Sequence, residues 1–98
     1  MGVRRFPLQA QQGRDATMID RIRTLLSGHP MIPLDFPALS DDANLYDAGL
    51  TSFASVQMML ALEEEFDVEF PEAMLTRRTF ASLANIADAV SQITRKAA

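Results

Sequence analysis

The chain has 98 residues, of which 48% are hydrophobic, so it suits one small folded domain and is too apolar for a disordered chain. It contains no cysteine and one histidine, which excludes disulfides, thiolate nucleophiles and histidine-rich metal sites. The net charge is −4, and every charged residue between Asp35 and Thr76 is acidic, which disfavours nucleic acid as a partner. This acidic field fits a partner with a basic patch, or is only a solvated face.

Residues 1–16 lack hydrophobic periodicity and are rich in Gln, Arg and Gly, which predicts a flexible N-terminal extension. They contain no apolar run of the kind found in secretory signals. No segment approaches the roughly 18 apolar residues that span a bilayer. We therefore expect a cytoplasmic protein without membrane contact, with one folded domain over residues 17–95.

A first helix is predicted to begin at Thr17, whose hydroxyl can cap it, with Asp20 three positions later in a capping-box-like role. Gly28 is a plausible end of this helix. His29 follows, and its position favours a role at the helix C-terminus over that of a metal ligand. Hydrophobic residues recur at helical spacing in between: Met18, Ile22, Leu25 and Leu26.

Residues 30–50 form a long connector with three prolines. Connectors of this length in small domains tend to be functional or well anchored. Its acidic run, DDANLYDAGL, lacks an acidic residue at the twelfth position of a calcium loop, so we reject a calcium site. The anchors that we expect are Leu34, Phe36, Leu39, Leu45 and Leu50.

Residues 52–66 carry the strongest helical pattern, with hydrophobic residues in two stripes rather than one. A helix at the surface of a small bundle needs one buried stripe. We assign burial to Met59, Leu62 and Phe66, with Met58 at the edge. The second stripe, Phe53, Val56 and Leu60, is either also buried or a docking surface. Its polar neighbours Gln57, Glu63 and Glu64 favour docking.

Two further helices are predicted after this one. Pro71 and Glu72 suit the first turn of a short helix that buries Met74 and Leu75 and ends at Arg77 and Arg78. The last helix begins near Thr79 or Ser82 and buries Leu83, Ile86, Val90 and Ile93. No segment reads as a strand. The fold class is therefore all-α: a small four-helix bundle with three longer helices, one short helix and a long first loop.

Ser52 stands where the connector gives way to the helix. The first amides of a helix are unpaired and its dipole is positive there, which suits either a structural serine cap or a phosphate ester on the hydroxyl. Ala48 and Gly49 leave the approach open. An enzyme site is poorly supported, because the many carboxylates have no histidine–nucleophile pair or phosphate-binding glycine loop to complement them.

The segment LYDAGLTSFASVQMMLALEEEFDVEFPE resembles acyl carrier proteins and the related peptidyl and aminoacyl carrier domains. The likeness covers residues 18–94 and includes the serine motif, loop length, helix order, acidic helix end and following proline. In that family, the motif that stands here as Gly49-Leu50-Thr51-Ser52-Phe53 carries 4′-phosphopantetheine on its serine. The resemblance implies a bundle of acyl-carrier type and a phosphoprotein whose arm, taken from coenzyme A, is attached to Ser52.

The resemblance also implies a role. Such a protein is not an enzyme; it holds an acyl or aminoacyl group as a thioester and delivers it to other enzymes. The implied partners are a phosphopantetheinyl transferase, a loading ligase and downstream acyl-transfer enzymes, with the carrier itself a monomer. The residues expected to dock against them are Thr51, Phe53, Val56, Gln57, Leu60, Glu63 and Glu64.

The sequence departs from fatty-acid carriers close to the serine. Those commonly place Asp before it and acids in the next turns, whereas this chain has Thr51, Ala54 and Gln57 there, and Phe53 replaces a common leucine. This predicts a specialised carrier, similar to small stand-alone carriers that amino acid:carrier protein ligases charge. The alternatives are a fatty-acid, polyketide or unusual-lipid carrier and, in a different class, a helical interaction module that is not a carrier.

Overall fold

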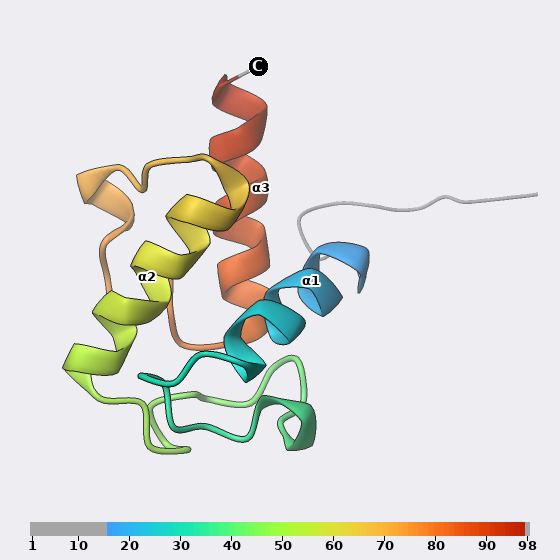
Figure 1. Cartoon of the computed structure of the whole chain (residues 1–98). Helices are drawn as coiled ribbons and strands as arrows, with labels where there is room; N and C mark the ends of the chain where they lie inside the picture. The colour runs from blue at the N-terminus through green and yellow to red at the C-terminus, as the bar shows by residue number, and fades with distance from the viewer. Residues whose placement is uncertain (1–15, 98) are drawn as a thin grey trace, which may run out of the picture.

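The computed structural model describes residues 16–97, and the side chains as far as Arg95. It contains three α-helices, α1 (Ala16–Ser27), α2 (Ser52–Phe66) and α3 (Leu83–Ala97), and two single turns of 3-10 helix, η1 (Phe36–Ala38) and η2 (Glu72–Met74) (Figure 1). Residues 16–97 contain no strand. The predicted all-α fold is confirmed, with η2 in the place of the expected short helix. The predicted extension, apart from Ala16, lies outside the described residues.

Helix α1 begins at Ala16, so Thr17 lies inside its first turn and the predicted cap at Thr17 is wrong. The spacing of the hydrophobic residues could not locate the first residue of the helix, because adding one residue at its start does not change which residues are buried. That face consists of Ile19, Ile22 and Leu26. At the other end, the His29 amide donates to the Leu26 carbonyl (3.1 Å), and the imidazole Nδ1 accepts from Met31 N–H (3.1 Å). His29 therefore ends the helix and shapes the next turn.

Helix α3 supplies a large part of the core. Ser82 precedes it, and the Ser82 hydroxyl accepts a hydrogen bond from the Asn85 amide (3.1 Å), which caps the helix. Its four predicted core residues are confirmed as buried: Leu83, Ile86, Val90 and Ile93. Helix α1 packs against both α2 and α3. The three helices thus enclose one hydrophobic core.

The connector between α1 and α2 closes the end of the bundle at which α2 begins (Figure 1). Phe36, Leu45 and Leu50 are buried as predicted, and Ile32 is buried although the pattern did not identify it. Leu34 and Leu39 are partly buried against the same core. The long loop is therefore part of the packed domain and sets the position from which α2 starts.

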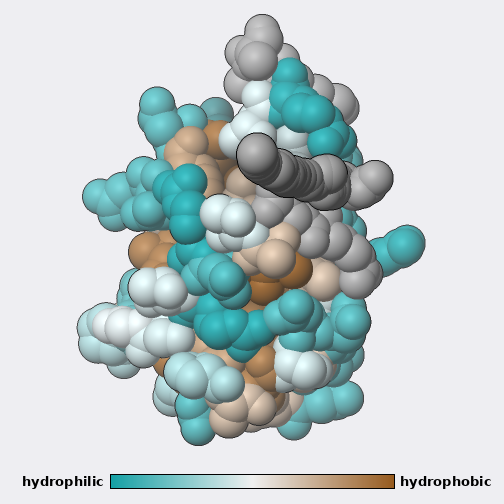
Figure 2. Space-filling view, turned by 90° about the vertical axis from the view of Figure 1, so that its right-hand side faces the viewer, coloured by the Kyte–Doolittle hydropathy of each residue, from teal (hydrophilic) through white to brown (hydrophobic). Residues whose placement is uncertain are grey.

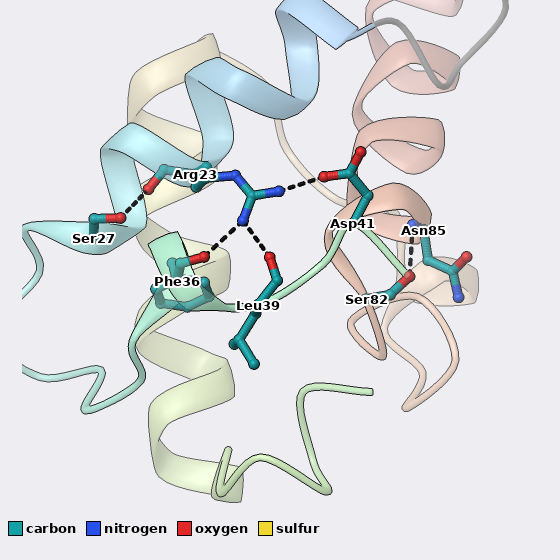
Figure 3. A network of polar contacts seen from close by, with 7 residues as sticks. All are labelled: Arg23, Ser27, Phe36, Leu39, Asp41, Ser82 and Asn85. Atoms are coloured by element: carbon teal, nitrogen blue, oxygen red, sulfur yellow. Dashed lines mark hydrogen bonds and ion pairs between the residues drawn. The ribbon is translucent and has the colours of Figure 1, made fainter. Parts of the chain in front are cut away.

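Arg23 of α1 holds the connector in place through its guanidinium (Figure 3). Nη1 donates to the carbonyls of Phe36 and Leu39, each at 2.6 Å, and Nη2 pairs with the Asp41 carboxylate. Charge-assisted hydrogen bonds of this kind are stronger than neutral ones. One side chain of α1 therefore satisfies the carbonyls around η1 and ties the connector to the helix.

The surface on the right-hand side of Figure 1 is largely hydrophilic, with hydrophobic side chains in small separate patches (Figure 2). Within residues 16–97, no helix has the length and apolar character needed to cross a membrane. No cluster of three or more His, Asp or Glu side chains suited to a metal ion occurs in that part of the chain either.

Candidate functional site

The loop before Ser52 is a compact turn built from its own hydrogen bonds. Asn44 Oδ1 accepts from the Asp47 amide (3.0 Å), and the Leu50 amide donates back to the Leu45 carbonyl (2.9 Å). Gly49 turns the chain with φ of 118°, a conformation that side-chain-bearing residues rarely adopt. The Leu45 amide donates to Ala81 (2.7 Å), which joins this loop to the start of α3. The position of Ser52 is therefore fixed both by the turn that precedes it and by the segment before α3 to which this turn is joined.

Thr51, and not Ser52, is the cap of α2. Thr51 has extended backbone angles (φ −92°, ψ 167°), and its Oγ1 accepts from the Ala54 amide at 3.1 Å. Ser52 is the first residue of the helix and is exposed. Within the described part of the chain its hydroxyl makes no hydrogen bond, although its carbonyl accepts from Ser55 Oγ (2.7 Å). The capping alternative for Ser52 is therefore wrong, and its hydroxyl is available for chemistry.

The exposed stripe of α2 extends from this serine. Phe53, Val56 and Leu60 are 57%, 48% and 49% exposed, as expected for a docking surface. Three large apolar side chains in one line on a small domain are unusual unless something covers them. The stripe begins one residue after Ser52, so any protein that covers it also approaches the serine.

The buried side of α2 differs from the prediction by one position. Ala54, Met58 and Leu62 are buried, whereas Met59 and Phe66 are only partly buried. The sequence placed Met58 at the edge of the buried stripe, and the structure places it at the centre. Two adjacent methionines fit either alignment of the apolar pattern, and the packing of α1 against α2 selects one.

The polar residues beside the exposed stripe have different roles. Thr51 is the cap, and Gln57 and Glu64 line a groove with Leu60 between α2 and the end of α1. Glu63, predicted as a docking residue, instead accepts a hydrogen bond from the Phe70 amide (2.9 Å) through Oε2. Its carboxylate therefore stabilises the loop after α2. The end of α2 is formed by Asp67 in the left-handed conformation (φ 53°), whose amide donates to the Glu63 carbonyl.

A cavity of about 350 Å³ lies beside Ser52, between α2 and the segment that leads to α3. Leu75, predicted to be buried, is 46% exposed and lines it, because η2 is a single turn and leaves Leu75 beyond its last residue. Arg77 also lines the cavity, with its guanidinium carbon 3.9 Å from the centroid of the Tyr46 ring. The full lining is Tyr46, Ser52, Ser55, Val56, Met59, Leu75, Thr76, Arg77 and Phe80.

The sequence did not predict this grouping. It identified Ser52 and Val56 but gave no role to Tyr46 and assigned Arg77 to a helix end. Arg77 is the first basic residue after the long acidic section, and that position was the one signal in the sequence that set it apart.

Comparison with known proteins agrees with this geometry. Residues 20–90 match the family model described as the phosphopantetheine attachment site. The chain is also 49% identical over 72 residues to an aminoacyl carrier protein of Agrobacterium fabrum, covering 74% of this chain and 87% of that one. A shorter match, 50% over 42 residues, links it to a D-alanyl carrier protein of Lactobacillus helveticus, 53% of which is covered. The chain belongs to the phosphopantetheine attachment-site family, and within it to the aminoacyl carrier proteins.

Solved structures of carrier proteins have the same fold. One is the carrier protein from Agrobacterium tumefaciens in complex with an engineered Bradyrhizobium japonicum glycine:[carrier protein] ligase and ATP. It matches with a TM-score of 0.71 and 47% identity, over 78% of this chain and 99% of the other. Another is from the structure of Bradyrhizobium japonicum glycine:[carrier protein] ligase complexed with its cognate carrier protein and an analogue of glycyl adenylate. It matches with a TM-score of 0.56 and 29% identity, over 78% of this chain and 94% of the other. The predicted acyl-carrier fold and family are confirmed.

Proteins of this family carry covalently attached 4′-phosphopantetheine, and the residues around Ser52 fit that group. The hydroxyl is exposed and is not used as a cap. Amides at the start of a helix favour an attached phosphate, because they are unpaired donors at the positive end of the dipole. The cavity beside Ser52 combines apolar walls from Val56, Met59 and Leu75 with one guanidinium. These residues can accommodate both the anionic and the apolar parts of the arm.

Proposed function

We propose that this protein carries an aminoacyl group on a 4′-phosphopantetheine arm attached to Ser52. The observation that carries the proposal is the division of roles between two adjacent residues: Thr51 caps α2, so the Ser52 hydroxyl stays exposed and has no hydrogen bond within the described residues. When bound, the arm supplies the thiol that this cysteine-free chain lacks, and that thiol holds the cargo as a thioester.

We further propose that an amino acid:carrier protein ligase charges the arm. The similar Agrobacterium carrier is found in complex with an engineered glycine:[carrier protein] ligase, which supports a partner of this class. The exposed stripe Phe53, Val56 and Leu60 is the surface that we assign to docking, with Thr51, Gln57 and Glu64 beside it. A ligase bound there lies next to Ser52, where the attached arm begins.

The remaining steps belong to other proteins. A phosphopantetheinyl transferase attaches the arm, and acyl-transfer enzymes receive the cargo. The chain itself catalyses nothing in this scheme, because the described side chains around Ser52 include no acid–base pair. The transferase uses coenzyme A and the ligase uses ATP, so we place the protein in the cytoplasm. We also propose that it is a monomer, because the docking stripe must stay accessible to these partners.

Intact-mass measurement tests the attachment. The apo protein is incubated with coenzyme A and a broad-specificity phosphopantetheinyl transferase, in parallel with Ser52→Ala and the control Ser55→Ala. We expect wild type and Ser55→Ala to gain one phosphopantetheine and Ser52→Ala to gain none. Addition to Ser52→Ala, or no addition to a folded wild type, would exclude the proposed site.

A second mass measurement tests the cargo. In one reaction the holo protein is incubated with ATP, a glycine:[carrier protein] ligase and either glycine or D-alanine. In a parallel reaction it is incubated with ATP, an acyl ligase and a fatty acid. A glycyl or alanyl adduct that is released by hydroxylamine supports an aminoacyl thioester. A fatty-acyl adduct alone would still support a carrier role, but the cargo would then be a fatty-acyl group and not an amino acid.

The alternative from a different class is a helical module that binds partners without carrying cargo, since the exposed stripe alone could serve such binding. This alternative predicts the same ligase affinity for apo, holo and Ser52→Ala protein, and no adduct. Calorimetric titration of these three forms distinguishes the two functions.

A further inference from the structure

The cavity beside Ser52 contains one charged side chain among its described lining residues, Arg77. Every other lining residue is neutral, and the nearest charged residue in the sequence is Asp47 before Ser52 and Glu63 after it. Resting on the proposed attachment at Ser52, we propose that Arg77 pairs with the phosphodiester formed there and so orients the arm along the cavity.

Tyr46 fixes the position of Arg77. The guanidinium lies over the Tyr46 ring, with its central carbon 3.9 Å from the ring centroid, within the range of a cation–π contact. Tyr46 itself belongs to the turn that leads to Ser52 and is partly buried. The contact between Tyr46 and Arg77 therefore links the turn before Ser52 to the segment before α3. Both side chains line the same cavity as Ser52.

The donors of Arg77 remain available in this arrangement. A guanidinium that stacks on an aromatic ring keeps its N–H groups at the edge of its plane, where they bond to phosphate oxygens. Within the described part of the chain, Arg77 makes no hydrogen bond or ion pair. Arg21 and Arg23 differ in this respect, because each has a carboxylate partner. Among the described residues, Arg77 is thus a positioned cation without a paired anion, and it lines the same cavity as Ser52, to which we propose that an anion is attached.

The apolar wall of the cavity extends the inference to the arm. Val56, Met59, Leu75 and Phe80 line the same space as Ser52 and Arg77. In phosphopantetheine the phosphate is joined through one methylene to a carbon with two methyls, which prefers an apolar surface over water. With its phosphate held at Arg77, the arm starts along this wall. Arg77 is exposed, so its attraction is screened by solvent and affects the orientation of the arm more than its attachment.

Arg78 provides a matched control. It has the same charge and follows Arg77 directly, but it lines a different cavity, together with Met74, Asn85 and Asp88. Arg77→Gln and Arg78→Gln therefore make the same change in net charge at two different cavities. An effect of overall charge should appear in both variants, whereas an effect of pairing with the phosphodiester should appear only in Arg77→Gln.

Nuclear magnetic resonance of the holo proteins tests the proposal after intact mass has confirmed that each carries the arm on Ser52. In wild type and Arg78→Gln we expect nuclear Overhauser contacts between the pantoyl methyls and Val56 or Leu75, and a phosphorus shift distinct from that of the urea-unfolded holo protein. In Arg77→Gln we expect the contacts to be lost and the phosphorus shift to move toward the unfolded value. Amide spectra that match wild type at positions away from residues 75–79 and from the cavity lining, which includes Tyr46 and Val56, confirm the fold.

Three results would overturn the inference. The first is an Arg77→Gln spectrum with the same contacts and phosphorus shift as wild type. The second is a wild-type protein without these contacts. The third is an equal loss in Arg78→Gln, which would reduce the effect to net charge. A protein that takes up no arm at Ser52 fails at the mass step, so failure of the proposed function is separated from failure of the Arg77 assignment.

Discussion

Helices α2 and α3 have the same length but use their hydrophobic residues differently. In α3 the apolar side chains Leu83, Ile86 and Val90 lie in one buried stripe. In α2, Met58 and Leu62 are buried while Val56 and Leu60 on another side are about half exposed. A helix that only completes a core needs one stripe, so the second stripe of α2 is not required by the core and is the surface to which we propose that a partner docks.

The largest expected effect concerns the buried sides of both helices. Ile86→Ala in α3 and Leu62→Ala in α2 remove fully buried side chains, and each should lower the free energy of unfolding by about 2–5 kcal/mol. Leu60→Ala in the exposed stripe should change it by less than about 0.5 kcal/mol. Urea denaturation measures all three. A cost for Leu60→Ala equal to that of Leu62→Ala would show that the two stripes of α2 do not differ in burial.

Phe66 should have an intermediate effect. The sequence placed it in the buried stripe, but it is partly exposed and Arg21 lies over its ring, 4.4 Å from the centroid. We expect Phe66→Ala to cost about 1–3 kcal/mol, below the range of about 3–5 kcal/mol for a fully buried phenylalanine. Thermal or urea unfolding checks the value. A loss within the higher range would mean that the end of α2 is as much part of the core as its middle.

The exposed stripe should affect binding more than stability. Leu60→Glu is expected to weaken the complex with a loading ligase about tenfold or more, equivalent to about 1.4 kcal/mol, because it places a charge in an apolar contact. The change in unfolding free energy should be small. Gln92→Glu, at an exposed position of α3, is the control and should leave affinity unchanged. Calorimetric titration distinguishes them, and equal affinities for both variants would exclude α2 as the docking helix.

The smallest effect distinguishes Thr51 from Ser52. Thr51→Ala removes the hydroxyl that caps α2 and should cost about 1 kcal/mol. Ser52→Ala removes a hydroxyl without a partner in the described residues and should change stability by less than about 0.5 kcal/mol. Melting curves of the apo proteins measure both. The reverse order would mean that Ser52 is the cap.

Much of the fold could be predicted from the sequence, because helices of this length are marked by local periodicity. The core residues of α3 and the anchors Phe36, Leu45 and Leu50 were identified in this way. The error at Thr17 occurred at an element end, where one residue more or less leaves the pattern unchanged. The error at Leu75 arose because the expected short helix is only the single turn Glu72–Met74, which ends before Leu75. Glu63 could not be assigned from its helical position, because its partner, the Phe70 amide, lies beyond the end of α2.

The sequence by itself determined that a Thr-Ser pair stands at the start of a helix with two apolar stripes, because residue order and helical period are local properties. Only the tertiary structure decided that Met58 rather than Met59 is at the centre of the buried side, since that depends on where α1 packs. It also decided that Thr51 caps α2 while the Ser52 hydroxyl has no hydrogen-bond partner among the described residues, and that Tyr46 and Arg77 meet beside it. These two residues are far apart in the chain, and only the packing of the loop before α2 against the segment before α3 brings them to the same cavity.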